Sequence, residues 1–201
     1  MNSKPDADLE QLRYHLALSQ APKVGPSVFK AILAYSGSAQ AFFQLPKAKA
    51  SKIPRVGEKL LEIQKQADSL LRSADELILL CQKKGYQILT PAEPNFPSRL
   101  KTQEDSPVVL FSQGKGQLKF DRSVGIVGTR SATPYGKSIT RKIVEDLLPY
   151  QPVILSGLAY GIDIEAHRAA LQVGLPTVAV MGSPISQIYP AAHKKTAEQL
   201  Q

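Results

Sequence analysis

The sequence predicts an α/β fold, in which a mostly parallel sheet follows a small helical region. Residues 9–84 carry apolar side chains at helical spacing and show no convincing strand. From about Gly85 onward, short apolar runs alternate with helical patterns, and three of these runs end in small residues. Such alternation is typical of a parallel sheet with helices on its faces.

Composition bounds the class of protein. The 201 residues carry a formal charge of +8, and 43% of them are hydrophobic, which is enough for a core. The excess charge favours an anionic partner but is spread out: residues 1–85 hold 13 basic and 8 acidic side chains, and residues 86–201 hold 12 and 9.

The sequence also bears on cellular location. It contains no run of about 18 apolar residues, so no membrane span is predicted. The N-terminus shows no signal-peptide pattern, and the single Cys81 lies in an apolar run, so we expect a cytoplasmic protein with a buried thiol.

Two similar turns punctuate the helical region. Pro22–Gly25 and Pro54–Gly57 lie 32 residues apart, and each precedes an apolar pair. Each turn could present backbone N–H groups to a nucleic-acid phosphate beside Lys23 or Arg55. Alternatively, the glycines only permit the positive φ of a short turn between helices. The sequence leaves both interpretations open.

Five apolar runs predict the strands of the second region. An irregular loop with three prolines separates the first two of them. The predicted strands are residues 86–90, 108–111, 124–127, 153–155 and 177–181.

The segment Ser123–Leu148 predicts a strand, a turn of small residues and a helix. Thr133 suits the N-cap of this helix, and Pro134 suits its first turn. The unpaired N–H groups of the helix favour an anion at the turn, where Arg130 could grip a phosphate with two hydrogen bonds. The turn lacks the dinucleotide fingerprint G-x-G-x-x-G. From the turn alone, a phosphate contact and an arginine that only caps the sheet edge are equal alternatives.

Ligands of parallel sheets bind beyond the carboxyl ends of the strands, and small residues follow three of the predicted strands. Small side chains there would let a ligand approach the backbone, and an anion would meet two helix N-termini and Arg130. Asp163 is predicted to cap a helix over residues 164–173. The candidate binding residues are Gly128, Thr129, Arg130, Ser131, Ser156, Gly157, Gly161, Asp163, Gly182 and Ser183.

We expect neither catalytic residues nor a metal or cofactor site. His167 lies one turn beyond Asp163, but no nucleophile or paired carboxylate stands at a diagnostic spacing, so the imidazole is predicted to pack beneath the strand ends. Ser156 lacks the G-x-S-x-G context of a hydrolase. The three histidines are scattered, without the spacing of metal ligands.

Three motifs together resemble the DNA-processing protein family DprA/Smf. They are GIVGTRSATPYG, SGLAYGIDIEAH and MGSPISQIYPAAHKK, in this order along the chain. The resemblance implies a Rossmann-like domain over residues 85–201. It also implies a sterile-alpha-motif-like or helix-hairpin-helix domain over residues 1–84.

The resemblance also implies a function. The family binds single-stranded DNA taken up in natural transformation, protects it and helps to load the recombinase RecA. Its phosphate-gripping arginine falls on Arg130, and a basic residue that contacts DNA falls on Lys194, after the step Tyr189–His193. A homodimer is a further implication, and no membrane association is expected.

Three departures from the family pattern bear on this expectation. Tyr160 stands where the family often has arginine, and its ring could either stack on a base or pack. His193 replaces an asparagine. The sequence ends at Gln201, before later elements of the family's sheet, so the Rossmann-like sheet is expected to be incomplete at its C-terminal end.

Two other functions remain as alternatives. One is a nucleotide hydrolase of the phosphoribohydrolase type, which would show a P-G-G-x-G-T-x-x-E loop that these residues lack. The other is a chain whose helical region alone is functional, as a protein-interaction module.

Overall fold

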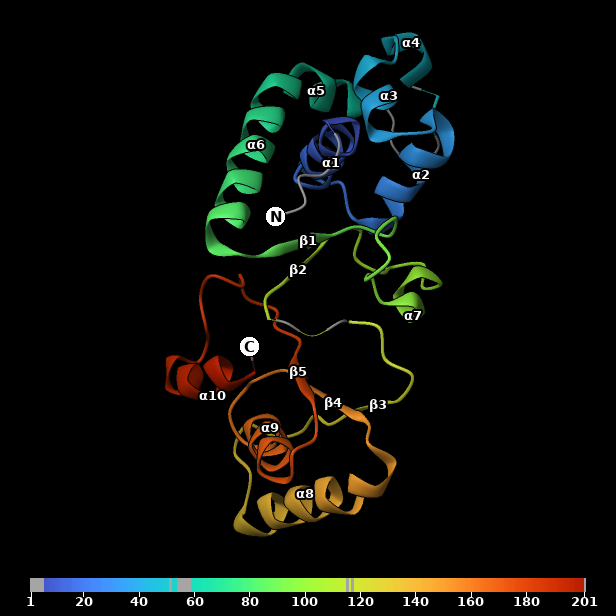
Figure 1. Cartoon of the computed structure of the whole chain (residues 1–201). Coiled ribbons are helices and arrows are strands. Elements are labelled where there is room, and N and C mark those ends of the chain that lie inside the picture. Colours follow the sequence, from blue (N-terminus) through green and yellow to red (C-terminus); the bar gives the residue numbers. More distant parts are fainter. Residues whose placement is uncertain (1–5, 51, 54–58, 115, 117, 201) are drawn as a thin grey trace. The chain divides into compact units, whose positions relative to one another are not determined.

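The structure is a computed structural model that describes residues 6–50, 52–53, 59–114, 116 and 118–200 (Figure 1). The chain divides into two compact units, Met1–Ser112 and Gln113–Gln201. The mixed α/β class predicted from the sequence is confirmed. The domain boundary predicted after residue 84 differs from this division, because the first pair of strands groups with the helices that precede it.

Helices make up most of the first unit. Apolar side chains at helical spacing bury one stripe of the first helix, α1, against the long sixth helix, α6: Leu12 and Leu16 pack with Ala74 and Ile78. The helices are α1 (Asp6–Ser19), α2 (Pro26–Ser36), α3 (Ala39–Gln44), α4 (Lys47–Ala50), α5 (Lys59–Lys65), α6 (Ala67–Lys84) and α7 (Ser98–Lys101).

The turn between α1 and α2 differs from its predicted geometry. Gly25 is the N-cap of α2 with an ordinary φ of −79°, and Pro26 begins the helix. Lys23 adopts the positive φ, 67°, that the sequence assigned to the glycine. The glycine at position 25 is therefore not needed for a positive φ, contrary to that interpretation of the turn. The similar turn Pro54–Gly57, with Arg55, lies outside the described residues.

Two short strands close the first unit. Strands β1 (Gln87–Leu89) and β2 (Leu110–Ser112) pair antiparallel, with Ile88 opposite Phe111. They form a two-stranded sheet of their own. The expectation that all five strands share one mostly parallel sheet is therefore wrong for these two.

The second unit contains a parallel three-stranded sheet in the order β3-β4-β5. In its register, Val124 lies beside Ile154, and Ile154 lies beside Thr177. Besides the longer helices α8 and α9, the described residues of this unit form two 3-10 helices, η1 and η2, and the short helix α10. The elements are β3 (Ser123–Gly125), α8 (Pro134–Asp146), η1 (Leu148–Tyr150), β4 (Val153–Ser156), α9 (Ile162–Val173), β5 (Thr177–Ala179), η2 (Ala191–His193) and α10 (Lys194–Gln199).

The core of the second unit lies between the sheet and the helices α8 and α9 (Figure 1). Val144 of α8, Ile154 of β4 and Ala166 of α9 are each fully buried there. Helix α8 follows β3 and helix α9 follows β4, so the N-termini of both helices lie near the carboxyl ends of these parallel strands, where α/β sheets bind ligands.

Two of the strands in this sheet, β3 and β5, end earlier than predicted, whereas β4 is one residue longer than the predicted run 153–155. Strand β3 ends at Gly125, although Ile126 still donates its N–H to the carbonyl of Leu155 at 2.9 Å. Val127, predicted to lie in a buried strand, is 77% exposed. Strand β5 likewise ends at Ala179 rather than at Met181.

Candidate functional site

Arg130 follows β3 and is exposed in the loop at the carboxyl edge of the parallel sheet. Among the described residues, no hydrogen bond or ion pair engages its guanidinium. In the described part of the chain, the guanidinium therefore makes no contact that would tie it to the sheet edge. A free guanidinium can bind an anion without first breaking an internal ion pair.

Local hydrogen bonds shape the turn that carries Arg130. The hydroxyl of Thr129 accepts the N–H of Ser131 at 3.2 Å. Thr133 caps α8 as predicted, since its hydroxyl accepts the N–H of Gly136 at 3.1 Å, and Pro134 begins the helix. The turn and the helix start are thus fixed by the sequence of this segment itself.

The loop after β4 is held from below by buried polar groups. Ser156 is buried and donates its hydroxyl to the carbonyl of Ile126 at 2.6 Å. The carboxylate of Asp163, also buried, accepts the N–H of Gly157 at 3.2 Å. Neither side chain is free to meet a ligand, so both residues support the site from beneath it.

Asp163 is not the N-cap of α9, contrary to the prediction. The helix begins at Ile162, two residues earlier than predicted, and its N-cap is Gly161. The carboxylate of Asp163 instead closes the loop back onto Gly157, because a first-turn side chain can reach an unpaired N–H outside its own helix.

At three glycines of this edge an added side chain would also clash with the protein itself, a constraint that the sequence analysis did not anticipate. A side chain at Gly161, where φ is +80°, would meet the carbonyl oxygen of Thr129 at 2.1 Å. At Gly128 the nearest atom would be Cγ1 of Ile162, and at Gly157 an oxygen of Asp163, both at 2.7 Å. Gly128 and Gly161 therefore let the loop after β3 pack against the start of α9, while Gly157 leaves room for the carboxylate of Asp163 within the loop after β4.

The N-terminus of α9 is partly satisfied from inside the protein. The N–H of Ile162 donates to the carbonyl of Thr129, and that of Ile164 donates to the carbonyl of Ala159, both at 3.2 Å. The predicted meeting of an anion with two free helix N-termini is therefore weakened on the α9 side. Side-chain cations must supply more of the attraction than we expected.

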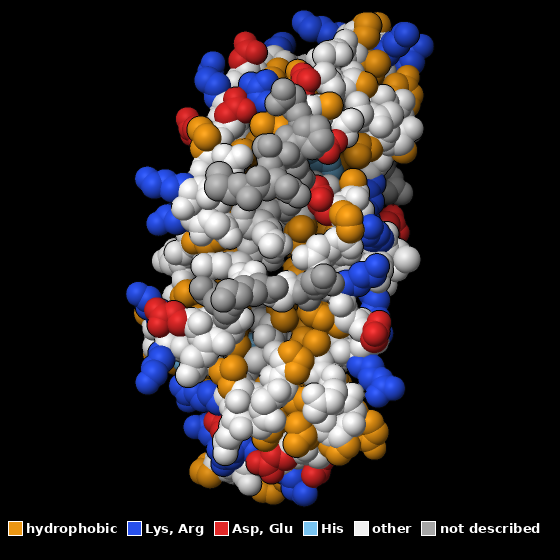
Figure 2. All heavy atoms as spheres, in the orientation of Figure 1, with side chains coloured by type: hydrophobic (Ala, Val, Ile, Leu, Met, Phe, Trp, Pro, Cys, Tyr) orange, Lys and Arg blue, Asp and Glu red, His pale blue; other side chains and the backbone are white. Residues whose placement is uncertain are grey.

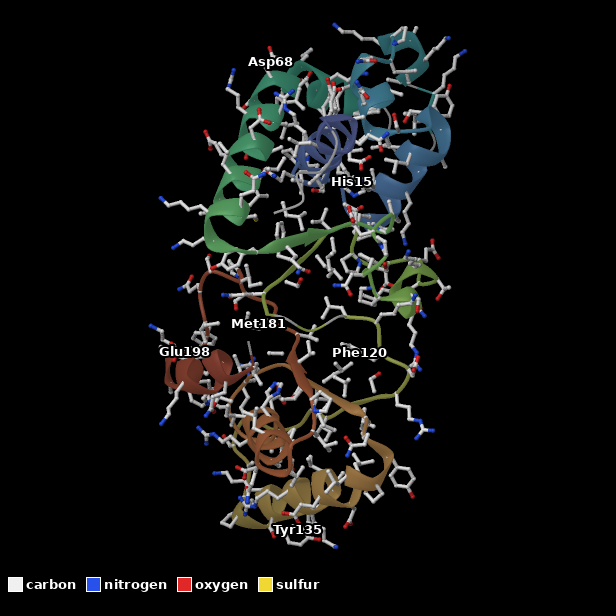
Figure 3. The ribbon with its side chains drawn as sticks, in the orientation of Figure 1. His15, Asp68, Phe120, Tyr135, Met181 and Glu198 are labelled. Atoms are coloured by element: carbon white, nitrogen blue, oxygen red, sulfur yellow. The ribbon has the colours of Figure 1, made fainter. Side chains whose placement is uncertain are left out.

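Two hollows adjoin at this edge and share Arg130 and Tyr160. The first has a volume of about 280 Å³ and the second about 380 Å³. The first hollow is lined by Arg130, Gly157, Ala159, Tyr160, Met181, Gly182, Ser183, Tyr189 and Pro190. The second hollow is lined by Arg130, Ser131, Ala132, Lys137, Tyr160, Gly161, Ile164, Glu165, Arg168 and His193. Figure 3 labels Met181, just beyond the end of β5.

The second hollow contains two cations that the sequence analysis missed. Lys137 of α8 and Arg168 of α9 are exposed and line it together with Arg130. The one acidic lining residue, Glu165, is paired with Arg141 at 2.5 Å. The hollow therefore carries a net positive charge. Each of these two residues lies within two turns of the start of its helix. A cation near the start of a helix that follows a parallel strand lies close to the strand ends, and this position could have identified both residues from the sequence.

Lys194 and the preceding residue His193 differ in their exposure to solvent. His193 is buried and donates Nδ1–H to the carbonyl of Leu158 at 2.7 Å. Lys194 is exposed at the start of α10 and is not among the residues that line the two hollows. Its role in binding stays a prediction.

His167 packs beneath the strand ends, as the sequence predicts. It is fully buried, and its Nδ1–H donates at 2.7 Å to the hydroxyl of Thr177, which itself donates to the carbonyl of Ile154. Its Nε2 has no partner among the described residues. Burial lowers the pKa of His167 to about 4, so the imidazole is neutral at physiological pH.

The described residues were also compared with the requirements of a metal site and of a membrane-spanning helix. Among them, no group of three or more His, Cys, Asp or Glu side chains is arranged to hold a metal ion. No helix in the described part of the chain combines the length and the apolar character needed to cross a membrane. Figure 2 shows Lys and Arg side chains distributed over both units and interspersed with Asp and Glu.

Comparisons with known proteins agree with this architecture. Residues 87–201 match the family model described as DNA recombination-mediator protein A. The Smf protein of Synechocystis is 33% identical over 195 residues, which cover 93% of this chain and 48% of the relative. The DNA processing protein DprA of Streptococcus pneumoniae is 38% identical over 105 residues, or 52% of this chain and 37% of the relative.

A solved structure shows the same fold. The X-ray structure of DNA processing protein A from Streptococcus pneumoniae superimposes with a TM-score of 0.68 at 26% sequence identity. The match covers 93% of this chain and 62% of that one. This chain therefore spans about half of the Synechocystis relative and less than two thirds of the solved structure.

Proposed function

Because this chain belongs to the DNA recombination-mediator protein A family, we propose that the two hollows bind the backbone of single-stranded DNA. The observation that carries the proposal is the exposed Arg130 at the junction of the hollows, whose guanidinium has no partner in the described part of the chain. A guanidinium matches the geometry of a phosphate and can donate two parallel hydrogen bonds to it. Arg130 thus supplies the central phosphate contact.

The charges around Arg130 extend the contact along a strand. Lys137 and Arg168 add two exposed cations, while Arg141 offsets the charge of Glu165. Successive phosphates of a single strand would meet successive cations, which is how sequence-independent binding of single strands is achieved. Ser131 and Ser183, which line the second and first hollows respectively, can donate further hydrogen bonds to the backbone.

We infer a binding rather than a catalytic role. The hydroxyl of Ser156 is committed to the carbonyl of Ile126 and is buried, so it is no nucleophile. The ring of His167 is sealed beneath the edge and neutral, and its Nδ1–H is bonded to Thr177. Neither group can reach a substrate in the hollows, which disfavours the alternative of a nucleotide hydrolase.

The test compares Arg130 with a matched arginine at the opposite edge of the sheet. Arg122 immediately precedes β3 and donates to the carbonyl of Tyr150 at 3.4 Å. We expect R130A to weaken binding to a fluorescent oligo-dT about tenfold, the loss of one charge-assisted contact, and R122A to leave it within about twofold. Fluorescence anisotropy with the 201-residue chain measures both, and equal losses would contradict the site.

The preference for single strands is tested in the same assay. A duplex of equal length presents paired, stacked bases, and we expect it to bind more weakly than oligo-dT at every salt concentration. Duplex binding equal to or stronger than single-strand binding would overturn the single-strand part of the proposal while leaving the phosphate contacts in place.

Three further roles rest on the family resemblance alone. We propose that the protein protects incoming DNA during natural transformation, assists RecA loading in the cytoplasm and can form a homodimer. Nuclease protection of the bound strand and RecA filament formation on it would measure the first two roles, and light scattering would measure the third.

A further inference from the structure

The second hollow holds a carboxylate among its cations. Of the described residues that line it, Glu165 is the one acidic side chain, beside the cations of Arg130, Lys137 and Arg168. Glu165 is only 9% exposed, so its charge is fixed at the wall of the hollow. A fixed negative charge opposes the binding of every phosphate, and it therefore lowers affinity unless it contributes selectivity.

The neighbouring helix holds this carboxylate in place. Arg141 of α8 donates Nη1–H to Oε1 of Glu165 at 2.5 Å. In the described part of the chain, Glu165 pairs with Arg141 and not with Arg168, which lies one turn further along α9. Because Arg141 is not among the residues that line the hollow, its charge lies further from a ligand than that of Glu165 and offsets it only in part.

Helix stability alone does not account for the position of Glu165. An acidic side chain in the first turn of a helix interacts favourably with the helix dipole, and α9 has both Asp163 and Glu165 there. Asp163 is buried, accepts the N–H of Gly157 and lines neither hollow. The helix thus has an acidic residue away from the ligand, and Glu165 is the one that a bound phosphate would meet.

We propose that Glu165 makes the second hollow selective for phosphate charge. It offsets the advantage that the doubly charged phosphates of free nucleotides and strand ends would otherwise gain from three cations, and so favours singly charged phosphodiesters. Repulsion grows with the product of the charges, so a phosphomonoester, with a charge of about −1.5 to −2, is opposed more strongly than a phosphodiester. This inference rests on the proposed function and names the charge of the ligand that its site accepts.

The test uses a pair of ligands that differ in the charge of one phosphate. Thymidine 5′-monophosphate carries about two negative charges at pH 7.5, and its methyl ester carries one. NMR titration of the 201-residue chain at constant ionic strength gives the ratio of the two dissociation constants, even where they are millimolar. E165Q removes the charge but keeps an oxygen that accepts from Arg141. We expect E165Q to shift the ratio about threefold or more toward the monophosphate.

Two further variants separate charge selection from a structural role. R141Q leaves the charge of Glu165 uncompensated and should shift the ratio in the opposite direction, toward the ester. An ion pair that only tied α8 to α9 would lower stability in both variants and leave the ratio unchanged. Glu145 of α8 is exposed and lines neither hollow, so E145Q removes the same formal charge and should keep the wild-type ratio. Thermal unfolding followed by circular dichroism checks that each variant is folded.

The outcomes separate this inference from the function beneath it. Charge selection is overturned if E165Q keeps the wild-type ratio, if E145Q shifts it equally, or if R141Q shifts it in the same direction. It is also overturned if the chain binds oligo-dT but neither small ligand, because the hollow then holds no single phosphate. In each of these cases a loss of oligo-dT binding in R130A still supports the proposed function. If the wild-type chain does not bind oligo-dT, both the function and the selectivity fail.

Discussion

At the scale of single residues, the buried imidazole of His167 shows how the site is supported from within. The Nδ1–H of His167 reaches Thr177, and this hydroxyl continues to the carbonyl of Ile154, so α9, β5 and β4 are tied together by one chain of bonds. The ring must remain neutral in the folded protein, because burial holds its pKa near 4.

This burial predicts an acid-sensitive fold. An unfolded histidine titrates near pH 6.5, so below that pH the unfolded chain binds a proton that the folded chain refuses until about pH 4. The contribution of His167 is therefore complete above pH 6.5 and is lost as the pH falls. We expect the free energy of unfolding to drop by about 2 kcal/mol between pH 7.5 and 5 from this residue.

The variant H167N isolates this effect. An asparagine amide can still donate to Thr177 but does not titrate in this range. Urea unfolding followed by circular dichroism should show a clearly smaller pH dependence for H167N than for the wild type. A remaining slope is expected from His15, since burial lowers its pKa as well. Identical slopes for the two proteins would contradict the argument.

At the scale of elements, the start of α9 is where two loops lock together. Gly161 combines a φ of +80° with backbone atoms of Thr129 and Arg130 within 2.7 Å of any added methyl group. Gly174, at the other end of the same helix, has a similar φ of +77° but open space around it. The two glycines therefore separate the cost of packing from the cost of backbone conformation.

We expect G161A to destabilise the protein by about 3 kcal/mol or more, since overpacking adds to the strained φ. G174A should cost only about 1 kcal/mol, the penalty of the left-handed conformation alone. Thermal unfolding of both variants measures the difference. Similar losses would show that the loops after β3 and β4 can separate without cost.

The same elements show what could be predicted from the sequence. Thr133 and Pro134 placed the start of α8 correctly, because capping depends on neighbours in the chain. Asp163 was predicted as a cap and is not one, because its carboxylate finds a partner six residues back in the loop. The pairing of β1 with β2 was missed as well, since apolar runs reveal strands but not their partners.

Only part of the candidate site could be predicted, because local sequence reveals turns and caps but not which helices pack together. Arg130 stands in a turn that the sequence itself marks, and the structure leaves it exposed at the sheet edge. Lys137 and Arg168 lie on helix surfaces, where cations are ordinarily solvated, and only the packing of α8 beside α9 brings them to one hollow. Local sequence therefore indicates the centre of the site, and tertiary structure determines its extent.

At the scale of the whole molecule, net charge and local charge make different predictions. Each unit carries a net charge of +4, from 15 basic and 11 acidic residues in the first and 10 and 6 in the second. Attraction by net charge alone would depend little on which cation is removed. Attraction at a built site depends on the cations that line it.

The salt dependence of binding distinguishes the two cases. Each phosphate neutralised on a single strand contributes about −0.7 to the slope of log K against log salt concentration, so three contacts give a slope of about −2. R130A, K137A and R168A should each make the slope shallower by about 0.7, because each removes one contact. R122A removes the same formal charge from the opposite sheet edge and should leave the slope unchanged. A slope that shifts equally in all four variants would mean that the charge of the molecule, and not the cations of the second hollow, holds the strand.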